Sequence, residues 1–374
     1  MRIIFNAYNL ILGGGLSVGQ GVMEGLVRGN PQEEIHVFLP KRQLYSFTSS
    51  GKLHVHFIPR FFTDYSIGRL LAGGFLSRKA RKLNPDRVFS LGNYALSVNC
   101  PQLLMLQWPY AVYPESSIWS KMSRADFIKR KLRLFFLKKS LKNASALTVQ
   151  TGVMKERVKK YLPGFSDKIF VVESSFRKES HPSADSQITS LREKKGEKLL
   201  LCMSEYYSHK NLEVLLPLAS LIKERKLDYK IIITIDPSLL GASKLLLKIN
   251  RKGLNNIIIN LGRVNPLKAN AVYHSCDALL LPTLLESYGI SYLEAAHARI
   301  PILTSDLDFA HALNGGTAWY FDSLSAESIL QTIQKAFSDP FILKEKIDQA
   351  FQKASKVRTW EEITKEYLKI LKAL

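Results

Sequence analysis

The sequence predicts an α/β protein made of two doubly wound, Rossmann-like domains that face a central cleft. Short apolar runs alternate with amphipathic helical segments along most of the chain, which is the pattern of βαβ units and parallel sheets. This alternation stops once, in a polar stretch near the middle, and then restarts. At 374 residues the chain also exceeds the size at which a single hydrophobic core stops growing. Together these observations favour two domains.

The strands are expected where apolar runs are bounded by turn residues. We place seven in the first domain, at residues 2–7, 35–39, 55–58, 87–91, 102–107, 146–150 and 169–172. The Ser- and Lys-rich stretch over 173–198 looks like a linker. Six further strands are expected at residues 199–203, 230–234, 257–261, 278–281, 301–304 and 318–321. We therefore expect domains at 1–175 and 176–345.

The composition excludes several classes of protein. A hydrophobic content of 46% argues against general disorder. No window approaches the roughly 20 apolar residues of a membrane span, and the first residues read as a strand, so secretion is not expected. Cys100, Cys202 and Cys276 are isolated within apolar runs and fit neither a disulfide framework nor a metal-binding spacing. We expect buried thiols in a cytoplasmic, reducing compartment.

The net charge of +21 is concentrated in the first part of the chain, where residues 1–200 hold 32 basic and 14 acidic side chains. The densest segment is a basic, amphipathic helix expected within residues 121–144. Three interpretations remain open: the helix lies on an anionic membrane surface, it is a solvated helix packed by its apolar side, or it grips nucleic acid. Its basic residues are Lys129, Arg130, Lys131, Arg133, Lys138, Lys139 and Lys142, and its apolar residues are Phe127, Ile128, Leu132, Phe135, Phe136 and Leu141.

Glycines follow the first expected strand. Gly13, Gly14 and Gly15 precede an apolar-periodic helix, so their bare backbone could approach a phosphate at the helix N-terminus. The spacing fits a dinucleotide fingerprint poorly, and the second strand ends in "VFLPKRQ" with no acid for a ribose, which disfavours nicotinamide chemistry. The alternative is a merely flexible loop.

Lys210 follows the first strand of the second domain, in "LLCMSEYYSHKNLEVLL". Asn211 or Ser208 can cap a helix that begins near Leu212, which leaves Lys210 beside positively polarised N–H groups. A diphosphate could be held there. The alternative is an ordinary surface lysine.

Two carboxylates flank another expected helix start, in "LLLPTLLESYGISYLEAAHARIPILTSD". A helix that begins near Gly289 directs free N–H groups toward a ligand and favours an anion. Glu286 precedes this helix and Glu294 lies about one turn inside it. Carboxylates beside a phosphate make sense if they accept hydrogen bonds from neighbouring hydroxyls, as in a nucleotide-sugar. Alternatively, Glu286 caps the helix and Glu294 pairs with a surface lysine.

This arrangement resembles the family-4 retaining glycosyltransferases of GT-B fold, the glycosyl transferases group 1. Their E-x7-E motif stands here as Glu286 and Glu294. The resemblance is strong over 199–329, including "LGRV" (261–264), "VYHSCDALLLP" (272–282) and "GGTAWYFDSLSAESI" (315–329). It continues more loosely before that, through the three glycines, "NPDRVFSLGN" (84–93) and "LTVQTGVMKERV" (147–158).

The resemblance implies a role for each matching residue. Glu286 would hydrogen-bond the transferred sugar and Glu294 the ribose. The diphosphate would be held by Lys210 and by amides of the second domain, and approached by glycines of the first domain as the cleft closes. These amides lie near Tyr288, Gly289 and Ile290, and the glycines are Gly14 and Gly15.

The resemblance also implies which residues hold the nucleotide base and how the C-terminal segment is arranged. The base would be cradled by Gly262, Arg263 and Val264. Residues 346–374, including Trp360, would form one long helix that crosses back to the first domain.

The resemblance further implies a retaining transfer by front-face attack, in which the departing diphosphate helps to deprotonate the acceptor. The protein then stabilises charge on the leaving group and positions two substrates. Glu286 and Lys210 are the expected catalytic residues. Cationic side chains and helix ends neutralise the diphosphate in this fold, so no metal or other cofactor is expected.

Two positions depart from the family. Its phosphate lysine is usually paired with an arginine five residues earlier, where this chain has Glu205; either another cation substitutes or Glu205 turns away from the diphosphate. A histidine common after a first-domain strand is replaced by Gln107 and Trp108, which are acceptor-side candidates. Trp108 could stack on a sugar ring or belong to the core. His209 could supply the missing hydrogen-bond donor, or it could be a helix cap or a surface residue.

The leading functional prediction is a bacterial glycosyltransferase that moves a hexose-type sugar from a nucleotide-diphosphate donor to a saccharide or lipid-linked acceptor. It would work at the inner membrane face, in synthesis of a surface polysaccharide such as lipopolysaccharide, and bind anionic lipid through its basic helix. One alternative is a nucleotide-sugar epimerase of similar fold, which the glutamate pair disfavours. Another is a non-catalytic membrane- or nucleic-acid-binding protein on a decayed transferase fold.

Overall fold

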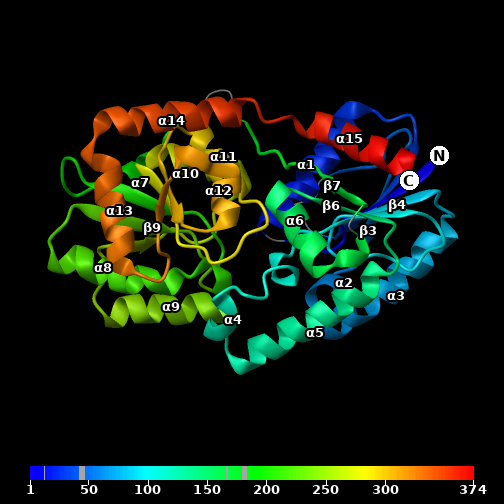
Figure 1. Cartoon of the computed structure of the whole chain (residues 1–374), viewed down its shortest axis with the longest axis horizontal. Coiled ribbons are helices and arrows are strands. Elements are labelled where there is room, and N and C mark those ends of the chain that lie inside the picture. Colours follow the sequence, from blue (N-terminus) through cyan, green and yellow to red (C-terminus); the bar gives the residue numbers. More distant parts are fainter. Residues whose placement is uncertain (12, 42–46, 166, 179–182) are drawn as a thin grey trace. The chain divides into compact units, whose positions relative to one another are not determined.

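The chain divides into two compact units in a computed structural model that describes residues 1–11, 13–41, 47–165, 167–178 and 183–374 (Figure 1). The first unit comprises Met1–Pro114, Ser123–Phe176 and Arg358–Leu374. The second unit comprises Glu115–Met122 and Arg177–Val357. Each unit is a parallel sheet with helices in its connections, so the prediction of two doubly wound domains is confirmed.

The first unit has a seven-stranded parallel sheet in the order β3-β2-β1-β4-β5-β6-β7. Its inner strands β1, β2, β4, β5 and β6 are almost wholly buried, which explains why they read as continuous apolar runs, whereas the edge strands β3 and β7 are partly exposed. The order reverses between β1 and β4. The strands are β1 (Arg2–Asn6), β2 (Glu34–Pro40), β3 (Leu53–Ile58), β4 (Arg87–Ser90), β5 (Gln102–Met105), β6 (Ala146–Val149) and β7 (Ile169–Val171).

The connections of the first unit are helical. They are α1 (Gly13–Gly29), α2 (Phe61–Asp64), α3 (Ser66–Lys82), α5 (Arg124–Leu141), α6 (Gly152–Tyr161) and α15 (Trp360–Ala373), with 3-10 turns η1 (Pro109–Ala111) and η2 (Pro163–Phe165). Two of these helices have a hydroxyl side chain as N-cap. Ser123 accepts from the Asp126 amide at the start of α5, and Thr151 accepts from the Met154 amide at the start of α6.

The second unit has a six-stranded parallel sheet in the order β10-β9-β8-β11-β12-β13. Its order reverses between β8 and β11. The strands are β8 (Lys198–Cys202), β9 (Tyr229–Ile233), β10 (Ile258–Asn260), β11 (Ala278–Leu281), β12 (Ile302–Ser305) and β13 (Trp319–Phe321). Every strand expected from the sequence in either domain is present, with ends that differ by at most two residues.

The helices of the second unit follow the same alternation. They are α4 (Ile118–Lys121), α7 (Ser186–Thr189), α8 (Leu215–Glu224), α9 (Leu240–Arg251), α10 (Ala269–Ser275), α11 (Ile290–His297), α12 (Asp308–Asn314), α13 (Ala326–Ser338) and α14 (Pro340–Ser355). Short 3-10 turns are η3 (Ser208–Lys210), η4 (Leu212–Val214), η5 (Pro266–Lys268) and η6 (Gly315–Thr317). None of the helices described is long and apolar enough to cross a membrane.

Three local expectations differ from the structure. The single helix expected over 346–374 is two helices, because α14 ends at Ser355 and α15 begins at Trp360, where the N-cap residue Thr359 forms a capping box with Glu362. Neither Asn211 nor Ser208 caps α8, which begins only at Leu215; the Asn211 amide instead donates to the Ser323 carbonyl at 2.7 Å. The expected linker over 173–198 contains the short helix α7, and its residues 179–182 lie outside the described part of the chain.

The thiols of Cys202 and Cys276 are buried as expected, whereas Cys100 is half-buried. Burial raises the pKa of Cys202 to about 12 and that of Cys276 to about 12, so both are protonated and unreactive near neutral pH.

The C-terminal helix α15 packs closely on α1, as the red and blue helices of the first unit show in Figure 1. Glycines make this approach possible. A Cβ on Gly21 would overlap the Trp360 indole, and a Cβ on Gly25 would overlap the Trp360 carbonyl oxygen and the Thr364 hydroxyl. The side chains of α15 thus fill the volume that larger residues on α1 would occupy.

We expect Gly25→Ala to lower the free energy of unfolding by about 1–3 kcal/mol, because its methyl group meets backbone that must shift. Urea-induced unfolding measures the change. Gly29→Ala is the matched control on the same helix, since a Cβ there would lie 3.8 Å from the nearest atom, Glu361 Cγ. A Gly25→Ala protein as stable as the control would contradict the close packing.

Candidate active site

Lys210 and Glu286 meet in the second unit, in the loops that follow β8 and β11. These two strands are neighbours at the reversal of the strand order, where open α/β sheets bind their ligands. The Lys210 ammonium pairs with Glu286 Oε1, and the two side chains are 18% and 14% exposed. The structure therefore joins the two residues that we predicted to be catalytic from separate motifs.

Backbone contacts hold these loops in register. The Leu284 amide donates to the His209 carbonyl at 2.7 Å. The buried Thr283 hydroxyl lies 3.1 Å from the same carbonyl and 3.3 Å from Glu286 Oε1. The His209 ring stacks on Tyr207, with 5.5 Å between centroids. Hydrogen bonds between the two loops thus position Lys210 and Glu286 relative to each other.

Helix α11 starts beside this pair, as the sequence indicated. Gly289, its N-cap residue, has φ +95°, and a Cβ there would lie 2.6 Å from the Tyr292 ring, so the turn requires glycine. Tyr288 is buried and Ile290 is half-buried. The Tyr292 amide donates to the Gly289 carbonyl at 3.0 Å. The helix dipole still makes this end of α11 attractive to an anion.

Glu294 lies one turn inside α11 and accepts a hydrogen bond from the buried Tyr273 hydroxyl at 2.7 Å. Burial raises the pKa of Glu294, while the tyrosine hydrogen bond lowers it. Glu286 makes no cap hydrogen bond to α11. The alternative in which Glu286 is a helix cap and Glu294 pairs with a surface lysine is therefore wrong.

Glu205 faces Arg263, which follows β10. The Arg263 Nε atom lies 3.5 Å from Glu205 Oε1. The Glu205 side chain is only 14% exposed, and its buried Oε2 atom has no hydrogen-bond partner among the described residues. Burial raises the pKa of Glu205 and Asp236 raises it further, whereas the Arg263 guanidinium lowers it. This carboxylate is thus balanced by one nearby cation.

The loop after β10 carries the residues expected to cradle a base. Gly262 has φ +71°, and its amide donates to Asn260 Oδ1 at 3.1 Å. No atom lies within 4 Å of a Cβ placed on Gly262. Arg263 is exposed and Val264 is half-buried. The backbone of this loop is therefore open on one side.

The glycines of the first unit form the first turn of α1 and do not precede it. Gly13 has φ +55°, Gly14 is exposed, and Gly15 is half-buried. A Cβ on Gly14 would meet no atom within 4 Å. They follow β1 at the reversal of the first sheet, although Leu12 in this loop lies outside the described residues. Arg42 and Gln43 of the "VFLPKRQ" segment also lie outside them.

Gln107 and Trp108 both contact other residues of the first unit. The Gln107 side-chain amide donates to the Leu91 carbonyl at 2.9 Å. Trp108 is 7% exposed, and the Arg133 guanidinium lies over its ring at 4.5 Å from the centroid. This placement favours the core interpretation of Trp108 over stacking on a sugar.

The basic segment is helical as expected, in α4 and α5, but its apolar side chains are mostly exposed. Only Leu137 and Leu141 of α5 are buried. Phe127, Ile128, Leu132, Phe135 and Phe136 are exposed. The interpretation of a solvated helix packed by its apolar side is therefore wrong.

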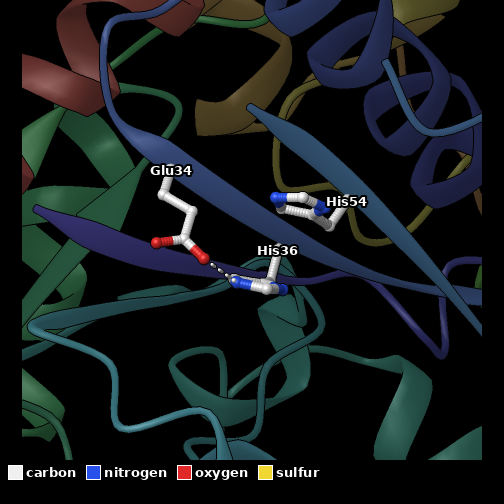
Figure 2. A group of neighbouring side chains, drawn as sticks. All are labelled: Glu34, His36 and His54. Atoms are coloured by element: carbon white, nitrogen blue, oxygen red, sulfur yellow. Dashed lines mark hydrogen bonds and ion pairs between the residues drawn. The ribbon is translucent and has the colours of Figure 1, made fainter. Parts of the chain in front are cut away.

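A second group of ionisable side chains, which the sequence analysis missed, lies on β2 and β3 of the first unit (Figure 2). Glu34, His36 and His54 each offer an atom, and these atoms lie within 4.8 Å of one another. Burial lowers the pKa of His36, and it lowers the pKa of His56 to about 4. The sequence signals for this group were "EIH" (34–36) and "HVH" (54–56), which lie in two different strands. The sequence alone does not show that these two segments are neighbours.

One family of known proteins matches most of the second unit. Residues 183–356 match the family described as Glycosyl transferases group 1. The O-antigen chain mannosyltransferase RfbU of Salmonella typhimurium is 24% identical over 216 residues, which are 56% of this chain and 57% of that protein. The chain thus spans less than two thirds of the length of this curated relative.

Solved structures match the whole fold. Sucrose-phosphate synthase from Thermosynechococcus elongatus has a TM-score of 0.75 at 13% identity, covering 100% of this chain and 98% of that one. HepE of Anabaena in complex with UDP-glucose has a TM-score of 0.73 at 16% identity, with 100% of both chains covered. The GT-B fold expected from the sequence is confirmed.

Glu205→Gln is expected to stabilise the protein most at alkaline pH. The pKa of Glu205 is higher in the folded state than in the unfolded state, so the folded protein binds this proton more tightly. The free energy of unfolding therefore falls as pH rises above the unfolded pKa of about 4.3. Removing this charge should add about 1 kcal/mol to the free energy of unfolding at pH 8 and less at pH 5. Thermal unfolding at both values measures the gain.

Glu345→Gln is the control for the change in net charge, because Glu345 is an exposed acid on α14 of the same unit. The control should show no comparable gain. Equal gains for the two variants, or a gain for Glu205→Gln that does not grow with pH, would contradict the burial argument.

Proposed function

We propose that this protein is a glycosyltransferase that uses a nucleotide-diphosphate sugar. The observation that carries the proposal is the pairing of Lys210 with Glu286 at the reversal of the second sheet, beside the N-terminus of α11. This site lies within the segment that matches Glycosyl transferases group 1. A lysine, a helix end and carboxylates at one strand edge suit a ligand that combines a diphosphate with hydroxyl groups.

Each part of the donor has a proposed partner. Lys210 and the amides near Tyr288, Gly289 and Ile290 hold the diphosphate. Glu286 accepts hydrogen bonds from the sugar and Glu294 from the ribose. The open backbone of 262–264 holds the base. The raised pKa of Glu294 suits a carboxylate that already has one donor, Tyr273, and needs others when ionised.

The proposed reaction retains the configuration of a hexose-type sugar. The bond between the anomeric carbon and the diphosphate oxygen breaks, the acceptor oxygen attacks from the same face, and its proton passes to the departing phosphate. Lys210 stabilises the charge that develops on the leaving group. Glu286 holds Lys210 while no donor is bound and then turns to the sugar hydroxyls. The chain supplies positioning and charge rather than a nucleophile, and we propose that the transfer needs no metal.

Arg263 is the proposed substitute for the cation that the resemblance led us to expect at position 205. It lies 3.5 Å from Glu205 and is exposed, so other N–H groups of its guanidinium can reach a bound anion. The His209 imidazole, next to Lys210 and stacked on Tyr207, is a further candidate contact with the donor.

We propose that the acceptor is a saccharide or a lipid-linked saccharide of a bacterial surface polysaccharide, and that the protein lies on the inner membrane face. The name of the relative from Salmonella typhimurium, an O-antigen chain mannosyltransferase, supports this class of acceptor. The exposed apolar row of α5 supports a membrane: Ile128 and Phe135 are 64% and 62% exposed, among basic side chains. Anionic lipid attracts the lysines and the interface accepts the apolar groups.

Donor binding is expected to depend on Glu294 and Lys210. In a panel of UDP-, GDP-, ADP- and CDP-sugars, one donor should raise the melting temperature, and Glu294→Ala should abolish this rise. Glu294→Gln tests the same site with less risk to folding, since its amide oxygen can still accept from Tyr273. Lys210→Gln should lower the transfer rate by about 10²–10³-fold. Thermal shift and product assays measure these effects.

Glu345→Gln, remote from the strand ends, should leave donor binding unchanged. If no nucleotide-sugar binds to the wild type while anionic vesicles do, the transferase proposal fails and a non-catalytic membrane protein takes its place. Binding without transfer or hydrolysis would reject the activity but keep the donor site.

Membrane binding is expected to depend on the exposed row of α5. Ile128→Ser with Phe135→Ser should weaken binding to phosphatidylglycerol vesicles by at least about tenfold, because two large apolar side chains no longer enter the interface. Vesicle co-sedimentation at low and high salt measures this. Phe341→Ser is the matched control, since Phe341 on α14 is 77% exposed. Unchanged vesicle binding, or stronger binding to duplex DNA, would overturn the membrane proposal.

A further inference from the structure

The parallel register of β2 and β3 places several ionisable side chains on one face of the first sheet. His36 is the register partner of His54, and Phe38 is the partner of His56. Alternate residues of a strand point to the same face, so Glu34 and His36 of β2 share a face with His54 and His56 of β3. The register brings together residues that are 18 or more positions apart in the chain.

The geometry of three of these side chains approaches that of a metal-binding site. Figure 2 shows the Glu34 carboxylate pointing at the His36 ring, with the His54 ring beside it. Glu34 Oε1 lies 3.0 Å from His36 Nε2, close to the roughly 3.3 Å that separates two ligands of a tetrahedral zinc ion. The His54 ring stacks on His36 with 4.8 Å between centroids. Its nitrogen, the His36 nitrogen and the carboxylate oxygen lie within 4.8 Å of one another.

Neighbouring groups already hold two of these ligands in place. His36 Nδ1 lies 2.9 Å from His56 Nε2, so His36 can donate from Nδ1 to His56 while Nε2 faces a metal. The Arg2 guanidinium binds the other carboxylate oxygen, Glu34 Oε2, at 3.0 Å. A cation that binds Oε1 and His36 Nε2 would therefore replace the hydrogen bond between these two atoms. The half-buried His54 ring needs only to turn out of its stacked orientation to direct its lone pair at the same point.

We propose that Glu34, His36 and His54 form a binding site for a divalent transition metal of the zinc type. Two imidazoles and one carboxylate are ligands that Zn²⁺, Co²⁺ and Ni²⁺ accept, and a water molecule completes the coordination. The site joins β3, which is the edge strand of its sheet, to β2. It lies at the amino ends of these strands, whereas ligands of open α/β sheets collect at the carboxyl ends. Its role is therefore to stabilise the edge of the sheet, not to take part in transfer.

Metal binding to the untagged, chelator-treated full chain tests this proposal. Zn²⁺ is expected to bind with a stoichiometry of one and to raise the melting temperature by about 5 °C at a concentration 100-fold above its Kd. Co²⁺ is expected to show the visible absorption of a tetrahedral site. His54→Ala and Glu34→Gln should each weaken the Zn²⁺ affinity by at least about tenfold. Calorimetry and absorption spectroscopy measure these effects.

His311→Ala is the matched control, because His311 pairs with Asp306 at 2.6 Å in the second unit and is another histidine beside a carboxylate. It should leave metal binding unchanged. Unfolding without added metal shows whether the two site variants fold as the wild type does. If the wild type binds no Zn²⁺, or if folded His54→Ala and Glu34→Gln bind it as tightly as the wild type, the proposal is overturned.

Discussion

The candidate active site depends on the parallel pairing of β8 with β11. Ala278 lies opposite Leu200 and Leu279 opposite Leu201, so the loops that leave the two strands emerge side by side. One loop carries Lys210 and the other Glu286. Both charges are mostly removed from water, and each would be uncompensated without the other, at a cost of about 3–5 kcal/mol. A ligand that enters here must therefore offer the lysine an anion and the glutamate a donor. The proposed donor, a nucleotide-diphosphate sugar, offers both.

The two edges of a parallel sheet carry different chemistry in this protein. At the carboxyl edge of the second sheet, Lys210 pairs with Glu286 and Arg263 faces Glu205, beside the N-terminus of α11. At the amino edge of the first sheet, Arg2, Glu34, His36 and His56 already form a continuous set of hydrogen bonds and one ion pair. The first arrangement suits a ligand that binds and leaves, whereas the second suits a permanent contact that holds an edge strand.

The sequence was sufficient for the strands and for the turn that begins α11 because both are local patterns. Buried parallel strands are continuous apolar runs, and Gly289 marks a turn that only glycine can make. The misses have long-range causes. The sequence left open whether Trp108 is a core residue, because Arg133, which covers its ring, lies 25 positions away. The histidine group depends on which residue of β2 lies opposite which residue of β3, and this register is not visible in either strand alone.

Glu205 shows how an unfavourable charge can persist in such a site. Its carboxylate is mostly buried, one of its oxygens has no partner among the described residues, and Asp236 repels it, so the folded protein bears a cost for keeping it. Arg263 is the compensating contact and stands at the end of β10, two strands away from β8 in the sheet. A glutamate at position 205 is thus compatible with anion binding only if its charge is spent on Arg263. Under the proposed function, Arg263 would therefore stay beside Glu205 while its other N–H groups contact the diphosphate.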